Sequence, residues 1–264
     1  MKLSIITINL NNAEGLRKTI VSVVSQTFTD YEFIVIDGGS TDGSVEVIKQ
    51  YADRISYWVS EPDRGVFHAM NKGIMQAKGD YCQFLNSGDW LIEPNGLQYV
   101  FEQNPVEDIV YCDEQTENGP RIYADKLTYF IFFMESITHQ AAFIKRVLFS
   151  TFGLYNEEHK IVSDWEFYLK TLFKAQCTYR HIPYFLVFFD DTGMSENPEF
   201  QKIHDAEREK VLKKEYPMMY DDYQELLMLK KEISIQNRSR LIQFVRQIQS
   251  SGFYQRIRRL SFRR

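Results

Sequence analysis

The sequence is poor in cysteine and has no long hydrophobic run. Its 264 residues include three cysteines, and none of them stands in a CxxC pair. Widely spaced cysteines in odd number argue against a disulfide framework and a structural zinc site, so we expect buried thiols in a reducing compartment. No stretch reaches the roughly 18 apolar residues of a membrane span, so we expect no transmembrane segment.

The apolar run at the N-terminus is short as well. It begins at Leu3 and is broken by Asn9, Asn11 and Asn12. Too few apolar residues remain for the core of a signal peptide. We therefore interpret this run as a buried strand of a cytoplasmic protein.

Basic residues are concentrated near the C-terminus, although the formal net charge of the chain is −5. Residues 230–264 contain ten Lys or Arg and one acid, a net charge of +9, which leaves −14 on the other 229 residues. An acidic body gives no reason to expect a nucleic-acid partner. The basic segment needs a separate explanation.

This segment has the pattern of a basic amphipathic helix. Apolar residues recur at helical spacing with arginines around them: Leu241, Phe244, Val245 and Ile248, with Arg238, Arg240 and Arg246. Such a helix is typical of binding to an anionic membrane surface, which would make the protein peripheral on the inner face of the cell membrane. Docking on the acidic body, within the chain or in a homodimer, is an equal alternative.

Strand-like and helix-like segments alternate in the first half of the chain. We expect strands at 3–8, 31–36, 55–59 and 81–85, and helices at 16–24, 44–51 and 66–77. This alternation indicates βαβ units with right-handed crossovers. It predicts an α/β fold with an open, mostly parallel twisted sheet flanked by helices.

The second half of the chain is less regular. We expect strands at 108–113 and 183–190, and helices at 147–152, 165–172, 199–214 and 221–235. The resulting organisation is one catalytic domain over residues 1–217, followed by a helical basic tail over residues 218–264. The catalytic domain would have a nucleotide-sugar-binding half, 1–95, and an acceptor-side half, 96–217.

Polar residues follow each of the first four expected strands. They are Thr7 and Asn9, then Asp37, then residues 61–65, then residues 86–89. Ligands of open α/β sheets bind just beyond the carboxyl ends of the strands, so these clusters should converge on one cleft. The glycine-rich run 37–43 matches neither GxGxxG nor the P-loop pattern, which argues against a nicotinamide, flavin or P-loop site.

Several motifs in the chain form a combined signal. They are SIITIN at 4–9, VIDGGSTDGS at 35–44, DRG at 63–65 with NKG at 71–73, GDY at 79–81 and LNSGD at 85–89. Together they closely resemble the family 2 glycosyltransferases, inverting enzymes of the GT-A fold. The resemblance covers about residues 1–95 strongly and continues loosely to about 215, through THQA at 138–141 and SDWE at 163–166.

The resemblance implies roles for these positions. Asp37 corresponds to the carboxylate that accepts from the nucleotide base. Thr7 and Asn9 correspond to base and ribose contacts, and Asp63 and Arg64 to residues that close over the base. The donor and diphosphate region comprises Asn71, Asn86, Ser87 and Asp89.

The resemblance also implies a divalent metal at Asp89, and elementary chemistry agrees. A departing diphosphate needs charge neutralisation, and Mg²⁺ or Mn²⁺ commonly binds one or two carboxylates together with substrate phosphates. The family usually has a DxD motif here, whereas this chain has Asn86, Ser87 and Gly88 before Asp89. The donor should therefore supply most of the metal's ligands. His181 or His204 could supply a further ligand.

The acceptor side is expected around His139, Asp164 and Glu166. Inverting transfer needs a base that takes the proton of the acceptor hydroxyl, and Asp164 matches the family's acid before an aromatic-rich helix. Glu166 is the second candidate. A helix N-cap is the alternative role for Asp164, because an apolar helical run follows it. His139 would contact the acceptor or the diphosphate, or else pack in the core.

The sequence therefore predicts a glycosyltransferase of polysaccharide biosynthesis. It would move a sugar from a nucleotide-diphosphate donor, with UDP favoured, to a hydroxyl of a glycan or lipid-linked saccharide. A non-catalytic protein that senses nucleotide sugars is one alternative, because the reduced DxD motif permits it. A sugar-nucleotide pyrophosphorylase fits less well, because the loop 9–14 has no cation to hold a triphosphate.

Overall fold

The computed structural model of the chain describes residues 1–134, 136–190 and 198–250. The chain divides into two compact units, Met1–Arg208 and Glu209–Arg264. The division lies within helix α8 (Pro198–Glu215), whereas we expected a boundary after residue 217. Every residue that we predicted in the active site belongs to the first unit.

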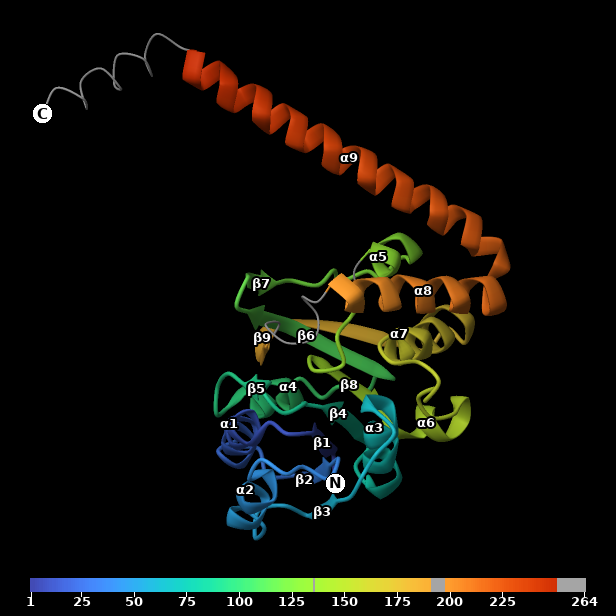
Figure 1. Cartoon of the computed structure of the whole chain (residues 1–264). Coiled ribbons are helices and arrows are strands. Elements are labelled where there is room, and N and C mark those ends of the chain that lie inside the picture. The colour runs from blue at the N-terminus through green and yellow to red at the C-terminus, as the bar shows by residue number, and fades with distance from the viewer. Residues whose placement is uncertain (135, 191–197, 251–264) are drawn as a thin grey trace, which may run out of the picture. The chain divides into compact units, whose positions relative to one another are not determined.

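One sheet forms the centre of the first unit. Its nine described strands follow the order β3-β2-β1-β4-β8-β6-β9-β5, with β7 paired to β6 (Figure 1). The strands of the first half are β1 (Leu3–Asn9), β2 (Tyr31–Asp37), β3 (Tyr57–Ser60) and β4 (Tyr81–Phe84). Those of the second half are β5 (Trp90–Leu91), β6 (Ile109–Thr116), β7 (Gly119–Arg121), β8 (Ala142–Lys145) and β9 (Tyr179–Phe189).

The first four strands are parallel, as the alternation of elements predicted. Strand β8 then pairs antiparallel with both β4 and β6, so the whole sheet is mixed. Strand β6 returns to a parallel pairing with β9. The parallel half and the mixed half meet at β4 and β8, in the middle of the sheet.

Helices connect these strands. Those of the first half are α1 (Ala13–Val24), α2 (Ser44–Gln50), α3 (Val66–Gln76) and α4 (Gly96–Glu102). Those of the second half are α5 (Tyr129–Met134), α6 (Arg146–Phe152) and α7 (Ser163–Tyr168), and a π-helical segment (Leu169–Lys174) continues α7. Asn12 caps α1, because its side-chain oxygen accepts from the backbone N–H of Gly15 at 3.0 Å.

Strands β1, β2 and β4 are buried on both sides, whereas β3 at the edge of the sheet is only half-buried. Ile5 of β1 packs in one apolar cluster with Ile20 of α1. The next residue, Ile6, faces α3 on the other side, where a Cβ added to Gly73 would lie 2.4 Å from Ile6 Cγ2. Because successive side chains of a strand point to opposite faces, a strand covered on both sides reads as a continuous apolar run.

The register of the parallel strands brings their polar ends to one edge of the sheet. Asn9 at the end of β1 lies beside Asp37 at the end of β2. Ile6 of β1 lies beside Phe84, the last residue of β4, so the turn after β4 begins at the same edge. The expected convergence of these segments on one edge is therefore a property of the fold.

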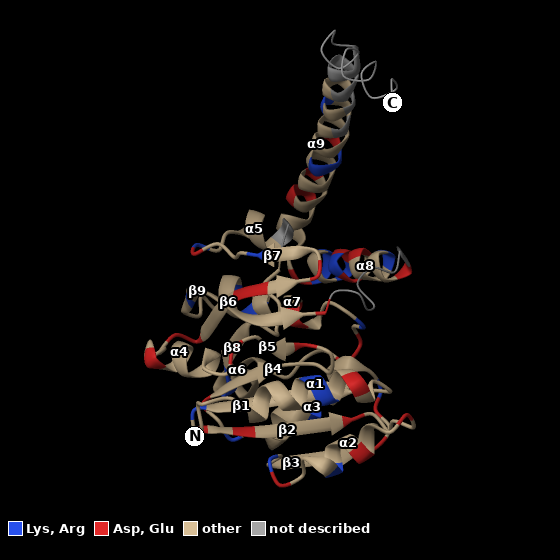
Figure 2. Cartoon of the chain, turned by 90° about the vertical axis from the view of Figure 1, so that its left-hand side faces the viewer, with Lys and Arg blue, Asp and Glu red and all other residues tan. Residues whose placement is uncertain are grey.

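The second unit contains the end of α8 and helix α9 (Pro217–Ser250). Both signs of charge are spread along α8 (Figure 2), and Glu209 accepts from Lys213 Nζ at 2.6 Å. In the described part of the chain, no helix is both long enough and apolar enough for a membrane crossing. Leu241 and Phe244 of the expected amphipathic helix are exposed. Most of its other side chains, and the arginines after residue 250, lie outside the described part.

Candidate active site

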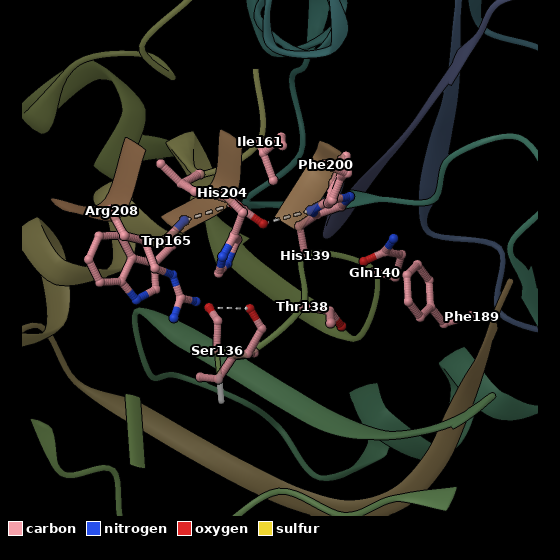
Figure 3. Close-up of a pocket in the computed structure, with 13 residues that line it drawn as sticks. Ser136, Thr138, His139, Gln140, Ile161, Trp165, Phe189, Phe200, His204 and Arg208 are labelled. Atoms are coloured by element: carbon pink, nitrogen blue, oxygen red, sulfur yellow. Dashed lines mark hydrogen bonds and ion pairs between the residues drawn. The ribbon is translucent and has the colours of Figure 1, made fainter. Parts of the chain in front are cut away.

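Two adjoining cavities lie at the carboxyl edge of the parallel strands. The first, of about 350 Å³, is lined by Asn12, Asn86, Ser87, Asp89, Lys160 and Asp190, among others. The second, of about 190 Å³, is lined by Asp164, Trp165, His204 and Arg208, among others (Figure 3). The two cavities share the side chains of His139, Gln140, Ile161, Phe189 and Phe200.

Asp37 is fully buried beneath the glycine-rich turn. One carboxylate oxygen accepts from Asn9 Nδ2 at 2.7 Å and from Ser40 Oγ at 2.6 Å. The other accepts from Ser60 Oγ at 2.6 Å and from the backbone N–H of Ser40 at 2.9 Å. Burial alone would raise the pKa of Asp37, but these hydrogen bonds outweigh it and hold the pKa below its usual value. Asp37 therefore organises the turn and presents no exposed atom to a nucleotide base.

The two strand residues assigned to base and ribose are buried as well. Thr7 is fully buried, and its hydroxyl donates to the backbone oxygen of Leu85 at 2.7 Å. Asn9 is 4% exposed, and its amide donates to Asp37 and Ser40. These side chains join the ends of β1, β2 and β4 to one another, and their direct contact with a base or ribose stays a prediction.

Asp63 lies beside Gly38, just past the end of β2, and lines neither of the two cavities. Its carboxylate is half-buried, and Oδ1 accepts from the backbone N–H of Gly65 at 2.9 Å. A Cβ added to Gly38 would lie 2.6 Å from Oδ2 of Asp63. The carboxylate of Asp63 thus fills the space that a side chain at position 38 would need. Position 38 is a glycine and directly follows Asp37.

Arg64 and Asn71 meet at Glu157. Arg64 Nη2 lies 2.5 Å from Glu157 Oε2, and the Arg64 side chain is 70% exposed. Asn71 is buried and donates to Glu157 Oε1 at 3.1 Å and to the backbone oxygen of Tyr155 at 2.8 Å. Asn71 therefore supports the segment around residue 155. Arg64 lies at the surface and lines neither of the two cavities.

The turn after β4 carries Asn86, Ser87, Gly88 and Asp89. Gly88 has a φ of +110°, which L side chains rarely adopt, so this position favours glycine. The hydroxyl of Thr19 accepts from the backbone N–H of Gly88 at 3.1 Å and donates to the backbone oxygen of Asp89 at 2.6 Å. Helix α1 thereby fixes the turn that presents Asn86, Ser87 and Asp89 to the first cavity.

Asp89 is 4% exposed and accepts a hydrogen bond at each carboxylate oxygen. Oδ1 accepts from the backbone N–H of Asp190 at 3.0 Å, and Oδ2 accepts from Gln140 Nε2 at 3.1 Å. Burial raises the pKa of Asp89 to about 7, and the two hydrogen bonds oppose this effect only in part. The carboxylate therefore changes its protonation state near neutral pH.

The carboxylates of the first cavity would hold a divalent metal only together with a substrate diphosphate. No group of three His, Cys, Asp or Glu in the described ranges could hold a metal ion by itself. Asp89 supplies hard oxygen atoms and lines the first cavity together with Asp190. Mg²⁺ and Mn²⁺ prefer such oxygen ligands and usually complete their coordination with phosphate and water. The arrangement suits these ions only when a donor is bound with them.

Asp164 lines the second cavity and contacts His139. Its Oδ2 lies 2.9 Å from His139 Nδ1, and its Oδ1 accepts from the backbone N–H of Trp165 at 2.8 Å. Helix α7 begins at Ser163, and Val162 is its N-cap residue. Asp164 is therefore in the first turn of the helix, so the alternative that it serves as the N-cap is wrong.

The remaining candidates lie elsewhere. Glu166 accepts from Asn156 Nδ2 at 3.3 Å, pairs with His159 at 3.3 Å, and lines neither cavity. His181 bridges Asp113 and Asp125, at 2.8 and 2.7 Å, also away from both cavities. His204 lines the second cavity, which Asp89 does not line. Neither histidine is therefore placed to complete a metal site at Asp89.

Sequence reasoning missed several residues of the first cavity, among them three that carry charge or bind Asp89. Lys160 is an exposed cation there, Asp190 follows the end of β9, and Gln140 donates to Asp89. Only Gln140 gave a signal, through its place beside His139 in the THQA motif. Lys160 and Asp190 stand in stretches without a motif, and the fold alone brings them to the cavity.

With this geometry established, comparisons with known proteins define the class of the protein. The sequence profile of "Glycosyl transferase family 2" matches residues 4–161. The chain is 30% identical over 202 residues to a PGL/p-HBAD biosynthesis glycosyltransferase of Mycobacterium bovis, which covers 72% of this chain and 77% of the relative. The chain therefore belongs to the family 2 glycosyltransferases, and it is an enzyme of that class.

Solved structures agree on the fold. TarS of S. aureus, in complex with UDP-GlcNAc, matches with a TM-score of 0.64 at 17% identity, over 80% of this chain and 70% of that one. The mannosyltransferase PcManGT of Pyrobaculum calidifontis, in complex with GDP-Man and Mn²⁺, matches with a TM-score of 0.58 at 15% identity, over 96% and 82%. At these identities the matches show the fold, which is the GT-A fold predicted from the motifs.

Proposed function

We propose that this glycosyltransferase takes a sugar from a nucleotide-diphosphate donor, UDP being favoured, and transfers it with inversion to a hydroxyl of a glycan or lipid-linked saccharide. The observation that carries the proposal is the presence of two carboxylates in adjoining cavities, Asp89 in the first and Asp164 in the second. Inverting transfer needs two such separate groups. One serves the departing diphosphate, and the other serves the attacking hydroxyl.

The first cavity suits the donor. Asn12, Ser87 and Lys160 offer polar contacts and one cation to a diphosphate, and the solved relatives of this fold bind UDP-GlcNAc in one case and GDP-Man in the other. We assign recognition of the base to Asp63, because Asp37 is buried and fully hydrogen-bonded. A carboxylate at Asp63 can accept from the N–H of uracil or guanine, whereas the corresponding ring nitrogen of cytosine is itself an acceptor.

Asp89 would hold the divalent metal together with the diphosphate. A bound Mg²⁺ or Mn²⁺ supplies Lewis-acid neutralisation of the leaving group, as its presence in the PcManGT complex also suggests. Gln140 and the backbone of Asp190 hold the Asp89 carboxylate in place. Lys160 contributes positive charge to the same cavity.

The second cavity suits the acceptor sugar. Phe200 is half-buried and offers apolar surface, and Arg208, whose guanidinium lies 4.7 Å from the centre of the buried Trp165 ring, lines the same cavity. Such mixed lining is common in sites for small polar ligands. Asp164 would take the proton of the acceptor hydroxyl as that oxygen attacks the anomeric carbon. A catalytic role for Asp164 argues against a protein that only senses nucleotide sugars.

Replacement of Asp63 and of Asp37 should cause different damage. Asp63→Asn places an amide N–H against the N–H of the base, so affinity for a nucleotide diphosphate should fall about tenfold or more, with stability unchanged. Asp37→Asn breaks a buried network and should cost about 1–3 kcal/mol of folding free energy, with affinity of the folded protein nearly unchanged. Calorimetry with UDP and GDP, with urea unfolding, separates the two. Normal binding by Asp63→Asn together with lost binding by a stable Asp37→Asn would return the base contact to Asp37.

Donor affinity in Mn²⁺ should depend on pH through Asp89. Because burial raises the pKa of Asp89 to about 7, protons compete with the metal below that pH. Affinity for UDP should therefore fall about tenfold from pH 8 to pH 6, which is the expected effect of one proton on a group of that pKa. EDTA should lower the affinity and abolish this pH dependence, and Asp89→Asn should do the same. Unchanged affinity and activity in EDTA would leave neutralisation of the diphosphate to Lys160.

Replacement of Asp164 should stop transfer without loss of donor binding. Asp164→Asn keeps the size of the side chain and removes the base, so turnover should fall by about 10²–10⁴-fold. Glu166→Gln is the matched control, since Glu166 is on the same helix and outside both cavities. Steady-state transfer and donor calorimetry measure the two effects. If Asp164→Asn keeps more than about a tenth of wild-type turnover, the loss is too small for a general base.

A further inference from the structure

Two consecutive side chains contact the two carboxylates of the site. Gln140 Nε2 donates to Asp89 Oδ2 at 3.1 Å, and His139 Nδ1 lies 2.9 Å from Asp164 Oδ2. The backbone oxygen of Gln140 accepts from Gln83 Nε2 of β4 at 2.9 Å, which ties this dipeptide to the buried centre of the sheet. The dipeptide therefore connects both carboxylates to one rigid part of the fold.

The contact with Asp164 places a proton on His139 Nδ1. A carboxylate oxygen accepts, so at 2.9 Å from Asp164 Oδ2 the Nδ1 atom is the donor. On the other side of the ring, Nε2 lies 3.0 Å from the side-chain amide of Asn86. The ring also packs edge-to-face on Phe84, with centroids 6.3 Å apart and an interplanar angle of 88°. His139 is thus held in one orientation, with Nδ1 toward Asp164.

We propose that His139 is a positioning residue for the base: it donates from Nδ1 to Asp164 and, through Asn86, ties the orientation of that carboxylate to the turn that carries Asp89. The inference rests on the proposed function, because it takes Asp164 as the base. Asp164 has two oxygens, and the backbone N–H of Trp165 binds the other one. Together the two donors fix the plane of the carboxylate beside the second cavity.

His139 does not itself serve as the base in this arrangement. Nδ1 donates a hydrogen bond to Asp164 and Nε2 faces the side-chain amide of Asn86, so neither ring nitrogen is left to take a proton from an acceptor hydroxyl. The pair resembles the way in which a carboxylate and a histidine orient each other in other enzymes, where such supporting contacts change activity by about 10–100-fold. The contact is also sheltered, because the side chains of His139 and Asp164 are 14% and 17% exposed.

The chain offers a matched control on the same helix. His159 Nε2 lies 3.3 Å from Glu166 Oε2, so a second histidine is paired with a carboxylate of α7. Neither His159 nor Glu166 lines the two cavities. Substitution of His159 therefore removes a comparable contact without reaching the base.

The test compares turnover with donor affinity in single variants of the full chain, in Mn²⁺. His139→Ala should lower transfer turnover by about 10–100-fold, and the Kd for UDP should stay within about threefold. His139→Asn retains an amide N–H near the position of Nδ1 and should recover part of the turnover. His159→Ala should transfer at the wild-type rate. Wild-type turnover in His139→Ala, or an equal loss in His139→Asn and His139→Ala, would overturn the inference.

A double variant shows whether His139 acts through Asp164. Once Asp164→Asn has removed the base, a residue that acts only through that base has nothing left to position, so adding His139→Ala should change the remaining turnover by less than about threefold. A further full loss in the double variant would mean that His139 touches the substrates itself, and the inference would be wrong. High turnover in Asp164→Asn alone would instead contradict the proposed base, which is a different failure.

Discussion

The arrangement of the site depends on hydrogen bonds from one short segment, residues 138–140, to carboxylates on two other parts of the chain. Gln140 holds Asp89, which follows β4, and His139 holds Asp164, at the start of α7. The segment is in turn bonded to Gln83 in the centre of the sheet. The two carboxylates that we propose for the donor and the acceptor are therefore held by adjacent residues of one segment. Such preorganisation lowers the entropic cost of bringing reactants together.

A second buried network supports the donor side. Asp37 binds Asn9, Ser40 and Ser60, and so connects the ends of β1, β2 and β3. A buried carboxylate is stable only when such donors surround it. Its network shapes the turn beside Asp63, whose carboxylate is half-buried and accepts from the backbone N–H of Gly65. The structure gives Asp37 a role in building the turn, and we propose Asp63 for recognition of the base.

Much of the fold could be predicted because the first four strands are largely apolar runs that end in polar residues and alternate with helical patterns, as in a parallel sheet. Strands β5 and β7 could not be predicted, since two and three residues are too short to show a period. Asp89, His139 and Asp164 were named from motifs, and the structure brings them to the two cavities. Burial of Asp37 could not be predicted from the motif, because the motif does not show whether its Asp side chain points into the turn or toward solvent. The contact of Asn86 with His139, 53 residues away, depends on the tertiary fold.

We propose that Asp164 activates a hydroxyl for a single attack on the anomeric carbon, opposite the diphosphate held at Asp89. The anomeric configuration of the product reports whether one attack or two has taken place. With an α-linked nucleotide sugar as donor and an acceptor that the enzyme accepts, the coupling constant of the anomeric proton in the product can be measured by NMR. The account predicts a β-linked product. An α-linked product would contradict it, because retention requires a different mechanism from one attack assisted by Asp164.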